Sequence, residues 1–431
     1  MTASRSDSLG GGGRATGGRN EALSGELPPG VSGTADAEFG PLVRAFARAF
    51  GHRRDAGAGL VVRRHGETLV DIGTGSVAGQ PWNADTGSII FSATKGIAAT
   101  VVHRLADRGL LDYQAPVAEY WPEFADNGKQ AITVEQVLTH RAGLSGVSTL
   151  AKQPVELLDH ELMEQRLAAA KPDRLLGIPA YHALTFGWLL AGLARAVTGQ
   201  SMGTLFRTEI AEPLGVEGIH LGRPPAGART VYAPLAGNQL SPIGTPLGAL
   251  ALSRLQGFPG PAGAAARALF MPGMEGILAG EFPPILATEL AAGNGVCTAS
   301  GLATLYGALA EGHTPDGQQF LSPHTVRTIR RIRSYQVDRT LFYLPMLWHL
   351  GYHSLPTPGG RGGFGHIGLG GSFGWVEPRL GLSVGFVHNR LTLPQLSLDQ
   401  VSAMWLLPLI MNCLRATDRV AVAKPPREAA A

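Results

Sequence analysis

The chain has 431 residues, of which 44% are hydrophobic, and a formal net charge of +3 at pH 7. Its length exceeds the usual size of one domain, so we expect two structural units or one domain that carries a large insertion. Because the net charge is small and no basic run is interleaved with aromatic residues, we expect neither nucleic acid nor an anionic membrane as a partner.

The two ends of the chain differ in composition from the rest. Residues 1–35 are rich in Gly and Ser and lack the apolar segment of a signal peptide, which predicts a disordered leader and a cytoplasmic protein. Residues 419–431 predict a loose tail. Cys297 and Cys413 are too few for a disulfide framework and fit a reducing compartment. No stretch is long and apolar enough to form an integral membrane segment.

Strand patterns come first in the body of the chain, and helical patterns follow. Two apolar runs within Leu60–Ile72 flank a turn near Gly66 and predict a β-hairpin. Apolar residues at helical spacing follow Lys95 and stop at Gly109, and Phe186–Val197 shows the clearest helical stripe.

The second half of the chain mixes irregular and regular patterns. The density of Pro and Gly in residues 223–265 predicts irregular structure. Strand patterns return at residues 371–376 and 382–388, which predict a second hairpin. Residues 396–414 predict a closing helix that is kinked at Pro408.

These patterns predict an α/β (α+β) protein whose strands come from both ends of the chain. Residues 36–105 and 290–418 would form one α/β domain, and residues 106–289 would form a mainly helical insertion domain. The sequence contains no visible internal repeat.

The tetrad Ser92-Ala93-Thr94-Lys95 carries the clearest chemical signal. If a helix begins at or just before Ser92, the hydroxyl and the amine lie on one face, with Cβ atoms about 5–6 Å apart. Serine is a weak nucleophile until a base removes its proton, and lysine is such a base only when it is neutral. Lowering the lysine pKa by about three units corresponds to a preference of roughly 4 kcal/mol for the neutral amine. The apolar residues after Lys95 favour the neutral form because they desolvate the amine. The alternative is a helix start with a solvated lysine.

Three further motifs follow the tetrad in a consistent order. They are Thr139-His140-Arg141-Ala142-Gly143-Leu144, Tyr181-His182-Ala183-Leu184-Thr185-Phe186-Gly187-Trp188 and Gly365-His366-Ile367-Gly368-Leu369-Gly370-Gly371-Ser372. With the tetrad, they resemble the motifs of the serine β-lactamase-like, penicillin-recognising enzymes over about residues 40–415. The resemblance is closest to the family VIII carboxylesterases, particularly their actinobacterial esterase/lipase members. It implies a β-lactamase/transpeptidase-like fold, with a mainly antiparallel sheet flanked by helices.

The resemblance also implies roles for individual residues. Ser92 would attack an ester or amide carbonyl and form an acyl-enzyme. Lys95, alone or together with Tyr181, would take the serine proton and return it to the leaving group. Without the resemblance, Tyr181 would be interpreted as an ordinary amphipathic aromatic residue.

Residues of the last motif would contact the substrate. The backbone N–H groups of Ser92 and Leu369 would form an oxyanion hole, with Leu369 on the strand after Gly368. His366 would face the substrate between two glycines, or would instead be a polar residue of the pocket wall or surface. Ala183 stands where β-lactamases have asparagine, and His366 stands where many have lysine. Both departures remove polar contacts to a β-lactam and favour a neutral ester.

The function implied is hydrolysis of carboxylic esters with short to medium acyl chains, with weak β-lactamase activity as a side reaction. The alternative is acyl transfer from the same acyl-enzyme to an alcohol or amine. A non-catalytic binding protein is less expected, because Ser92, Lys95 and Tyr181 are all present. The partner would be a small-molecule ester, no metal or organic cofactor would be needed, and the sequence leaves the oligomeric state open.

Competing patterns are present but weaker. Gly370–Gly374 matches G-x-S-x-G around Ser372, yet a strand pattern follows where a nucleophile elbow needs a helix. Gly73–Ala78 resembles a dinucleotide fingerprint without a following helix. His349 and His353 have zinc-helix spacing without the glutamate of H-E-x-x-H. Other residues are interpreted as either pocket-lining or structural: His140, His182, Trp348, Tyr352 and Trp375.

Overall fold

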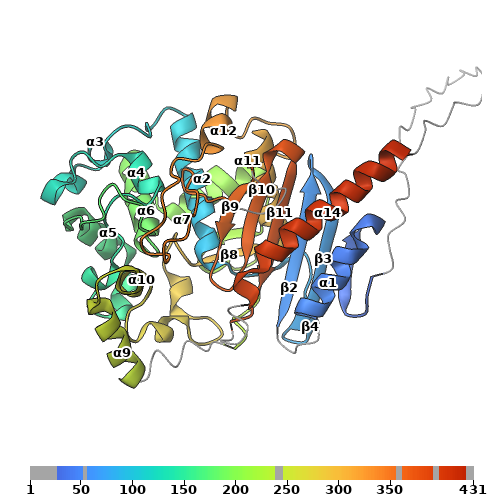
Figure 1. The fold of residues 1–431 in the computed structure, drawn as a ribbon, viewed down its shortest axis with the longest axis horizontal. Coiled ribbons are helices and arrows are strands. Elements are labelled where there is room, and N and C mark those ends of the chain that lie inside the picture. The colour runs from blue at the N-terminus through green and yellow to red at the C-terminus, as the bar shows by residue number, and fades with distance from the viewer. Residues whose placement is uncertain (1–26, 52–55, 238–245, 356–361, 392–397, 424–431) are drawn as a thin grey trace, which may run out of the picture.

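The computed structural model describes residues 27–51, 56–237, 246–355, 362–391 and 398–423 (Figure 1). The expectations for residues 1–26 and 424–431 lie outside the described residues. Within the described part of the chain, no helix combines the length and apolarity that a membrane crossing requires.

A seven-stranded sheet combines the two ends of the chain. Its strands run in the order β1-β3-β2-β11-β10-β9, with β4 beside β3, and every neighbouring pair is antiparallel. The strands are β1 Val31–Ala35, β2 Gly57–Arg64, β3 Glu67–Val77, β4 Gln80–Pro81, β9 Phe364–Ile367, β10 Phe373–Glu377 and β11 Leu382–His388. Because β2 pairs with β11, Leu60 lies opposite Phe386. The predicted fold class, with its antiparallel sheet built from both ends, is confirmed.

Both predicted hairpins are present. β2 and β3 are joined by His65 and Gly66, with φ angles of +48° and +79°. Positive φ at both central residues is the property of a type I′ turn, which matches the twist of antiparallel strands. β10 and β11 are joined through a 3₁₀ turn that ends at Gly381, where φ is +58°.

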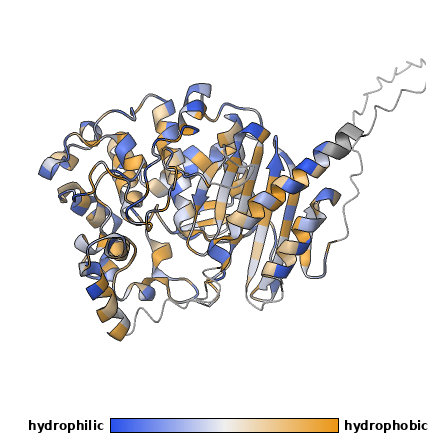
Figure 2. Ribbon diagram, viewed as in Figure 1, coloured by the Kyte–Doolittle hydropathy of each residue, from blue (hydrophilic) through white to orange (hydrophobic). Residues whose placement is uncertain are grey.

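Alternate residues of the strands pack against helices on opposite faces of the sheet. In β2, Leu60 and Val62 pack with residues of α1 (Gly40–Phe50) and α14 (Ser402–Ala423). Val61 instead belongs to the larger core on the other face, where α11 (Ala299–Glu311) lies against β2, β10 and β11. Figure 2 shows hydrophobic residues along the strands between these helices.

The helices between the two groups of strands lie to one side of the sheet (Figure 1). They are α2 Thr94–Asp107, α3 Val117–Tyr120, α4 Val134–Leu138, α5 His160–Ala169, α6 Thr185–Thr198, α7 Met202–Leu205, α8 Glu212–Leu214, α9 Pro246–Gly257 and α10 Pro261–Leu269, and α12 Pro323–Ile329 follows α11. A π-helical turn, Phe206–Ala211, joins α7 and α8. α6 confirms the clearest predicted stripe and ends at Gly199, which has a left-handed φ of +70°.

Short 3₁₀ segments occur throughout the described residues. They are η1 Ala37–Phe39, η2 Phe91–Ala93, η3 Pro122–Gly128, η4 Val147–Thr149, η5 Pro154–Leu158, η7 Met274–Leu278, η8 Pro284–Ala287 and η9 Pro378–Leu380. One of them, η2, contains the serine of the tetrad, so this residue is presented on a short turn in front of a long helix.

A smaller, four-stranded sheet leads into the tetrad. Its order is β6-β8-β5-β7, and its strands are β5 Thr86–Ile89, β6 Ile219–Leu221, β7 Val231–Tyr232 and β8 Gly295–Thr298. β5 and β8 belong to the predicted α/β domain, whereas β6 and β7 belong to the predicted insertion. The division into these two domains stays a prediction.

Three sequence expectations are corrected. The leader was expected to reach residue 35, but β1 pairs with β3 through Val31 and Thr74, so the fold begins earlier. Residues 223–265 are not all irregular, because they contain α9 and the start of α10, an alanine-rich helix with Pro261 in its first turn, where proline is tolerated. α14 begins at Ser402 rather than at residue 396 and continues to Ala423, past the expected start of the tail. Pro408 lies inside this helix.

Gly385 tests the packing of α11 on the sheet. A Cβ at this position would lie 2.0 Å from the carbonyl oxygen of Ala299 and 2.8 Å from the nitrogen of Ala303. Gly385→Ala should therefore lower the free energy of unfolding by about 1–3 kcal/mol, because α11 must move off the sheet. Urea unfolding measures the change. Gly257→Ala is the control, since its Cβ would meet no atom within 4 Å; equal stability of the two variants would contradict this packing.

Candidate active site

The tetrad begins in a strained turn between β5 and α2. Phe91 has a φ of +45°, a left-handed conformation that costs a bulky residue about 1–3 kcal/mol. The Thr94 hydroxyl donates to the Phe91 carbonyl at 2.6 Å and accepts from the Gly295 N–H at 3.0 Å. The Ile90 N–H donates to the Gly295 carbonyl at 2.9 Å. These bonds fix the position of Ser92, and the helical segment starts just before it, as the sequence predicts.

The side chains of Ser92 and Lys95 meet, as their spacing predicts. Lys95 Nζ lies 2.9 Å from Ser92 Oγ and donates to the carbonyl oxygen of Ala292 at 2.9 Å. The Lys95 side chain is completely buried, and desolvation holds its pKa well below the usual 10.5. A lysine in this environment tends to be neutral and is able to accept a proton from the serine hydroxyl.

Tyr181 completes a cluster of three polar side chains. Its hydroxyl hydrogen-bonds with Ser92, and Lys95 Nζ lies 4.9 Å from the centroid of its ring. Burial raises the pKa of Tyr181 above its usual value, so the phenol stays protonated near neutral pH. The structure thus brings Ser92, Lys95 and Tyr181 together from separate parts of the chain.

Asp338 supports Tyr181, and the sequence analysis missed it. Its Oδ1 accepts the backbone N–H of Tyr181 at 3.1 Å, and its Oδ2 accepts Trp348 Nε1 at 3.1 Å. The Trp348 ring stacks on the Tyr181 ring, with centroids 5.7 Å apart and planes 7° apart. One buried carboxylate therefore fixes both the backbone of Tyr181 and the ring beside it. Asp338 lies in a segment without periodicity or a motif, so the sequence carried no signal for it.

His140 and His182 hold the loop that carries Tyr181. The His182 N–H donates to His140 Nδ1 at 3.2 Å, and the Ala180 N–H donates to the His140 carbonyl at 2.9 Å. His182 Nε2 accepts the Leu144 N–H at 3.1 Å. Both rings are completely buried, and desolvation lowers the pKa of each, to about 4 for His182. They are structural residues, one of the two interpretations that the sequence left open.

The segment after β9 lies against the Ser92 turn. A Cβ on Gly368 would lie 2.0 Å from the Ile90 carbonyl oxygen and 3.4 Å from the Ala93 nitrogen, so only glycine allows this approach. Leu369 lies in a turn between β9 and β10, not on a strand as expected, and it lines the same cavity as Ser92. This arrangement fits the predicted oxyanion hole, which stays a prediction.

His366 is buried behind this segment. Its ring centroid lies 6.3 Å from that of Tyr181 and 5.0 Å from that of His353. Its Nδ1 hydrogen-bonds with the Ile367 carbonyl at 3.1 Å, and its Nε2 has no partner among the described residues. Burial holds the pKa of His366 well below 6.5, so the ring is neutral. The cavity next to Ser92 is lined by Leu369 and not by His366.

Gln400 hydrogen-bonds with the segment of Leu369, and no sequence pattern indicated this residue. The Gln400 side chain accepts the Gly370 N–H at 3.0 Å and donates to the Gly368 carbonyl at 3.2 Å. Gly371 has a φ of +106°, and a Cβ there would lie 1.8 Å from the Asp399 carbonyl oxygen. The chain just before α14 therefore fixes this segment of the site.

Ser92 opens into an apolar cavity of about 160 Å³. Besides Ser92, its walls include Phe91, Ala183, Leu184, Leu269, Phe270, Met271, Met274, Glu275, Leu278, Ile285, Leu290, Ala292, Gly293 and Leu369. The sequence left open whether three aromatic residues line the pocket or pack in the core. All three pack in the core and are at most 2% exposed: Trp348, Tyr352 and Trp375. α10 contributes only Leu269, its last residue, and the segment after it contributes most of the remaining apolar side chains.

The competing motifs have structural roles. Ser372 is buried, and its Oγ accepts the His388 N–H at 3.2 Å, with β10 rather than a helix after it. His349 uses Nδ1 for the Ile329 carbonyl and Nε2 for Ser354. Among the described residues, no group of three or more His, Cys, Asp or Glu side chains is placed to hold a metal ion.

Comparisons with known proteins agree on one family. A sequence model of the family described as Beta-lactamase matches residues 43–405. The chain is 47% identical over 383 residues to esterase/beta-lactamase LipL of Mycobacterium tuberculosis, a match that covers 88% of each protein. It is 29% identical to the crystal structure of a family VIII carboxylesterase, with a TM-score of 0.71 over 89% of this chain and 99% of that one. A penicillin-binding protein homologue from Caulobacter crescentus gives the same TM-score and identity over 87% and 99% of the chains.

An alkyl fluorophosphonate tests the reactivity of the cluster. We expect its adduct at Ser92, located by peptide mass spectrometry, because the Ser92 hydroxyl lies 2.9 Å from a buried amine and lines a cavity. Lys95→Ala should slow labelling by about 10²–10⁴-fold, the usual contribution of a general base. Ser372→Ala is the control and should label at the rate of the unchanged protein; an adduct on Ser372 would overturn the assignment.

Proposed function

The chain belongs to the beta-lactamase family, and from that premise we propose that it is a serine hydrolase that cleaves carboxylic esters through an acyl-enzyme on Ser92. The observation that carries the proposal is the 2.9 Å contact between Ser92 Oγ and the buried Nζ of Lys95. The ester specificity is supported by the names of LipL and of the family VIII carboxylesterase structure.

Acylation begins with transfer of the Ser92 proton to the neutral Lys95 amine, alone or together with Tyr181. Ser92 Oγ then bonds to the ester carbonyl carbon, and the carbonyl oxygen becomes an oxyanion held by the N–H groups of Ser92 and Leu369. Collapse of this intermediate breaks the bond to the alcohol oxygen, which takes the proton from Lys95 or Tyr181. Tyr181 suits this relay because its protonated hydroxyl bonds to Ser92.

Deacylation uses the same groups in reverse. A water molecule gives a proton to Lys95, and its oxygen attacks the acyl carbon. The bond from the acyl carbon to Ser92 Oγ breaks, Ser92 regains a proton, and the carboxylic acid leaves. No metal or organic cofactor has a role in either half of this proposal.

The cavity supports a neutral ester with a short acyl chain. Its walls are apolar apart from Ser92 and Glu275, and its volume is about 160 Å³, below the range of about 300–1,000 Å³ that is typical of sites for larger ligands. Met271 and Met274 are flexible side chains that would adapt to a longer chain. Ala183 offers no amide to a β-lactam, so any β-lactam hydrolysis should be slow.

Acyl transfer is the second candidate, and the apolar cavity favours it. An acyl-enzyme reacts with any nucleophile that reaches it. Because the cavity has few polar groups in its wall, it holds little water, so an alcohol or amine competes better with hydrolysis. Adding an alcohol acceptor to the esterase assay separates the two outcomes, because transfer gives a new ester in place of the free acid.

Chain-length preference tests the cavity. We expect kcat/KM for p-nitrophenyl butyrate to exceed that for p-nitrophenyl laurate by about tenfold or more, because the longer chain does not fit. Ser92→Ala should abolish both activities, and turnover of nitrocefin should be far slower than that of butyrate. Met274→Ala should enlarge the cavity and therefore lower the ratio of kcat/KM for butyrate to kcat/KM for laurate. Faster turnover of laurate by the unchanged protein would contradict the proposed substrate class.

The pH dependence of kcat/KM tests whether Lys95 is the base. Lys95 acts only when neutral, so kcat/KM falls as the pH drops through its pKa. Because burial lowers that pKa well below 10.5, the acid limb should lie well below pH 10. Profiles of log kcat/KM with p-nitrophenyl acetate measure it. A limb near 10.5 would mean a lysine in ordinary solvation and would contradict this role.

A further inference from the structure

A second cavity, of about 530 Å³, shares α10 with the apolar cavity. Leu269, at the end of α10, lines the apolar cavity, whereas Pro261, Ala264 and Arg267 line the second one. The volume lies within the range of about 300–1,000 Å³ that is typical of small-molecule sites. Nothing in the proposed reaction uses this cavity.

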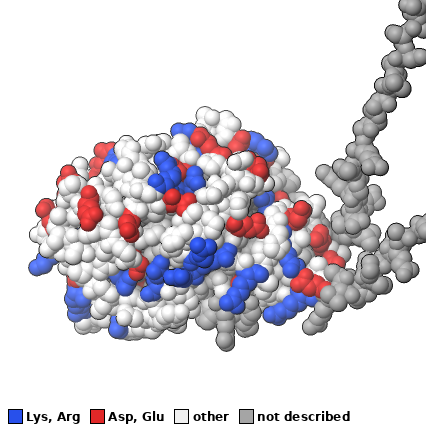
Figure 3. Space-filling model, turned by 90° about the horizontal axis from the view of Figure 1, so that it is seen from above, with Lys and Arg blue, Asp and Glu red and all other residues white. Residues whose placement is uncertain are grey.

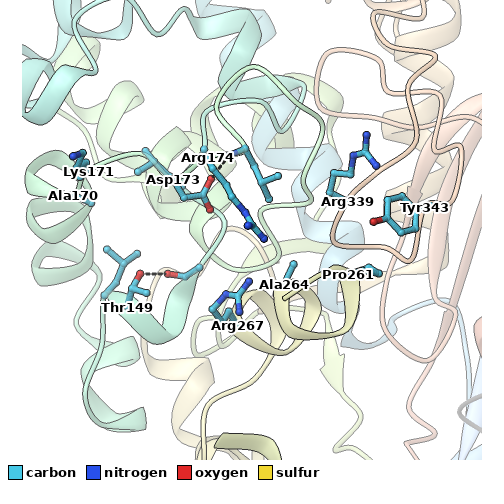
Figure 4. Close-up of a pocket in the computed structure, with 16 residues that line it drawn as sticks. Thr149, Ala170, Lys171, Asp173, Arg174, Pro261, Ala264, Arg267, Arg339 and Tyr343 are labelled. Atoms are coloured by element: carbon cyan, nitrogen blue, oxygen red, sulfur yellow. Dashed lines mark hydrogen bonds between the residues drawn. The ribbon is translucent and has the colours of Figure 1, made fainter. Parts of the chain in front are cut away.

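Cationic side chains dominate the polar lining. Lys171, Arg174, Arg267 and Arg339 line the cavity, with Asp173 as the one carboxylate among its lining residues. Figure 4 shows Arg174 and Arg267 reaching toward each other from opposite sides of the cavity, whereas Lys171 and Arg339 point away from its centre. Elsewhere, on the face that Figure 3 shows, basic and acidic side chains are interspersed.

The two converging guanidinium groups lack a sufficient counter-charge. The ion pairs formed by the described residues include neither Arg174 nor Arg267. Arg267 donates from Nη1 to the carbonyl oxygens of Gln256 and Phe258, which orients the side chain without neutralising its charge. Asp173 is within the electrostatic reach of both arginines, but one carboxylate balances only one of them.

We propose that this cavity binds a small organic anion, with its carboxylate or phosphate group between Arg174 and Arg267. A guanidinium presents paired N–H donors that match the oxygens of either group, and the anion removes the repulsion between the two cations. The apolar part of the ligand packs on the remaining wall, which includes Leu150, Leu175 and Ala264. The site is independent of Ser92, so it holds whether or not the esterase proposal does.

Calorimetric titration of the full chain tests the site, with sodium hexanoate, hexyl phosphate and the neutral 1-hexanol as probes. Arg174→Gln should weaken binding of the anions by about tenfold or more, because charge-assisted hydrogen bonds are lost. Arg174 makes no hydrogen bond or ion pair with the described residues, so the fold should be unchanged. Lys171→Gln removes the same charge at the edge of the cavity and should change affinity less than about twofold. Raising the salt concentration should weaken binding in the unchanged protein.

Each result has a defined meaning. Saturable binding of hexanoate alone identifies a carboxylate site, and binding of hexyl phosphate alone identifies a phosphate site. Ester turnover should be the same in Arg174→Gln as in the unchanged protein. The proposal fails if neither anion binds at millimolar concentration, if 1-hexanol binds as tightly as the anions, or if Arg174→Gln binds them undiminished.

Discussion

Lys95 is buried with no acidic partner among the described residues, and the chemistry of the site depends on this condition. Its amine hydrogen-bonds with neutral oxygens, those of Ser92 and Ala292. A carboxylate in contact with the amine would keep it charged and would remove the base. The titratable groups around the amine are also uncharged, because burial keeps the rings of His140 and His366 neutral and the Tyr181 hydroxyl protonated. The site is therefore a set of uncharged polar groups inside an apolar core.

Three segments that are distant in sequence meet around Ser92, and each is fixed by its own contacts. The smaller sheet holds the strained turn of Ser92 beside Ala292. Asp338 and the two buried histidines hold the loop of Tyr181. Gln400 holds the segment of Leu369 against the turn. Because each segment is anchored separately, the reacting groups are placed before any substrate arrives, which lowers the cost of organising them during the reaction.

The sequence predicted what depends on local pattern. Spacing alone placed Ser92 next to Lys95, and apolar runs on either side of a turn predicted the two hairpins at the centre of the sheet. It did not identify Asp338 or Gln400, because each acts through a contact with residues far along the chain and belongs to no repeat or motif. It also assigned irregular structure to α10, where local Pro and Gly suggested a loop but a run of alanines forms a helix. The walls of the apolar cavity were missed because they come from segments around Phe91, Leu184, Met271 and Leu369, which only the fold brings together.

The pairing of β2 with β11 has a consequence for synthesis of the protein. The hairpin of β2 and β3 emerges from the ribosome early, but its central partner, residues 382–388, is made near the end of the chain. Until then, one edge of β2 is unpaired, and its apolar face, including Leu60 and Val62, is covered by α1 but lacks α14. The nascent chain is thus exposed to aggregation for most of its translation, and we expect its yield to depend on chaperones that bind unpaired strands.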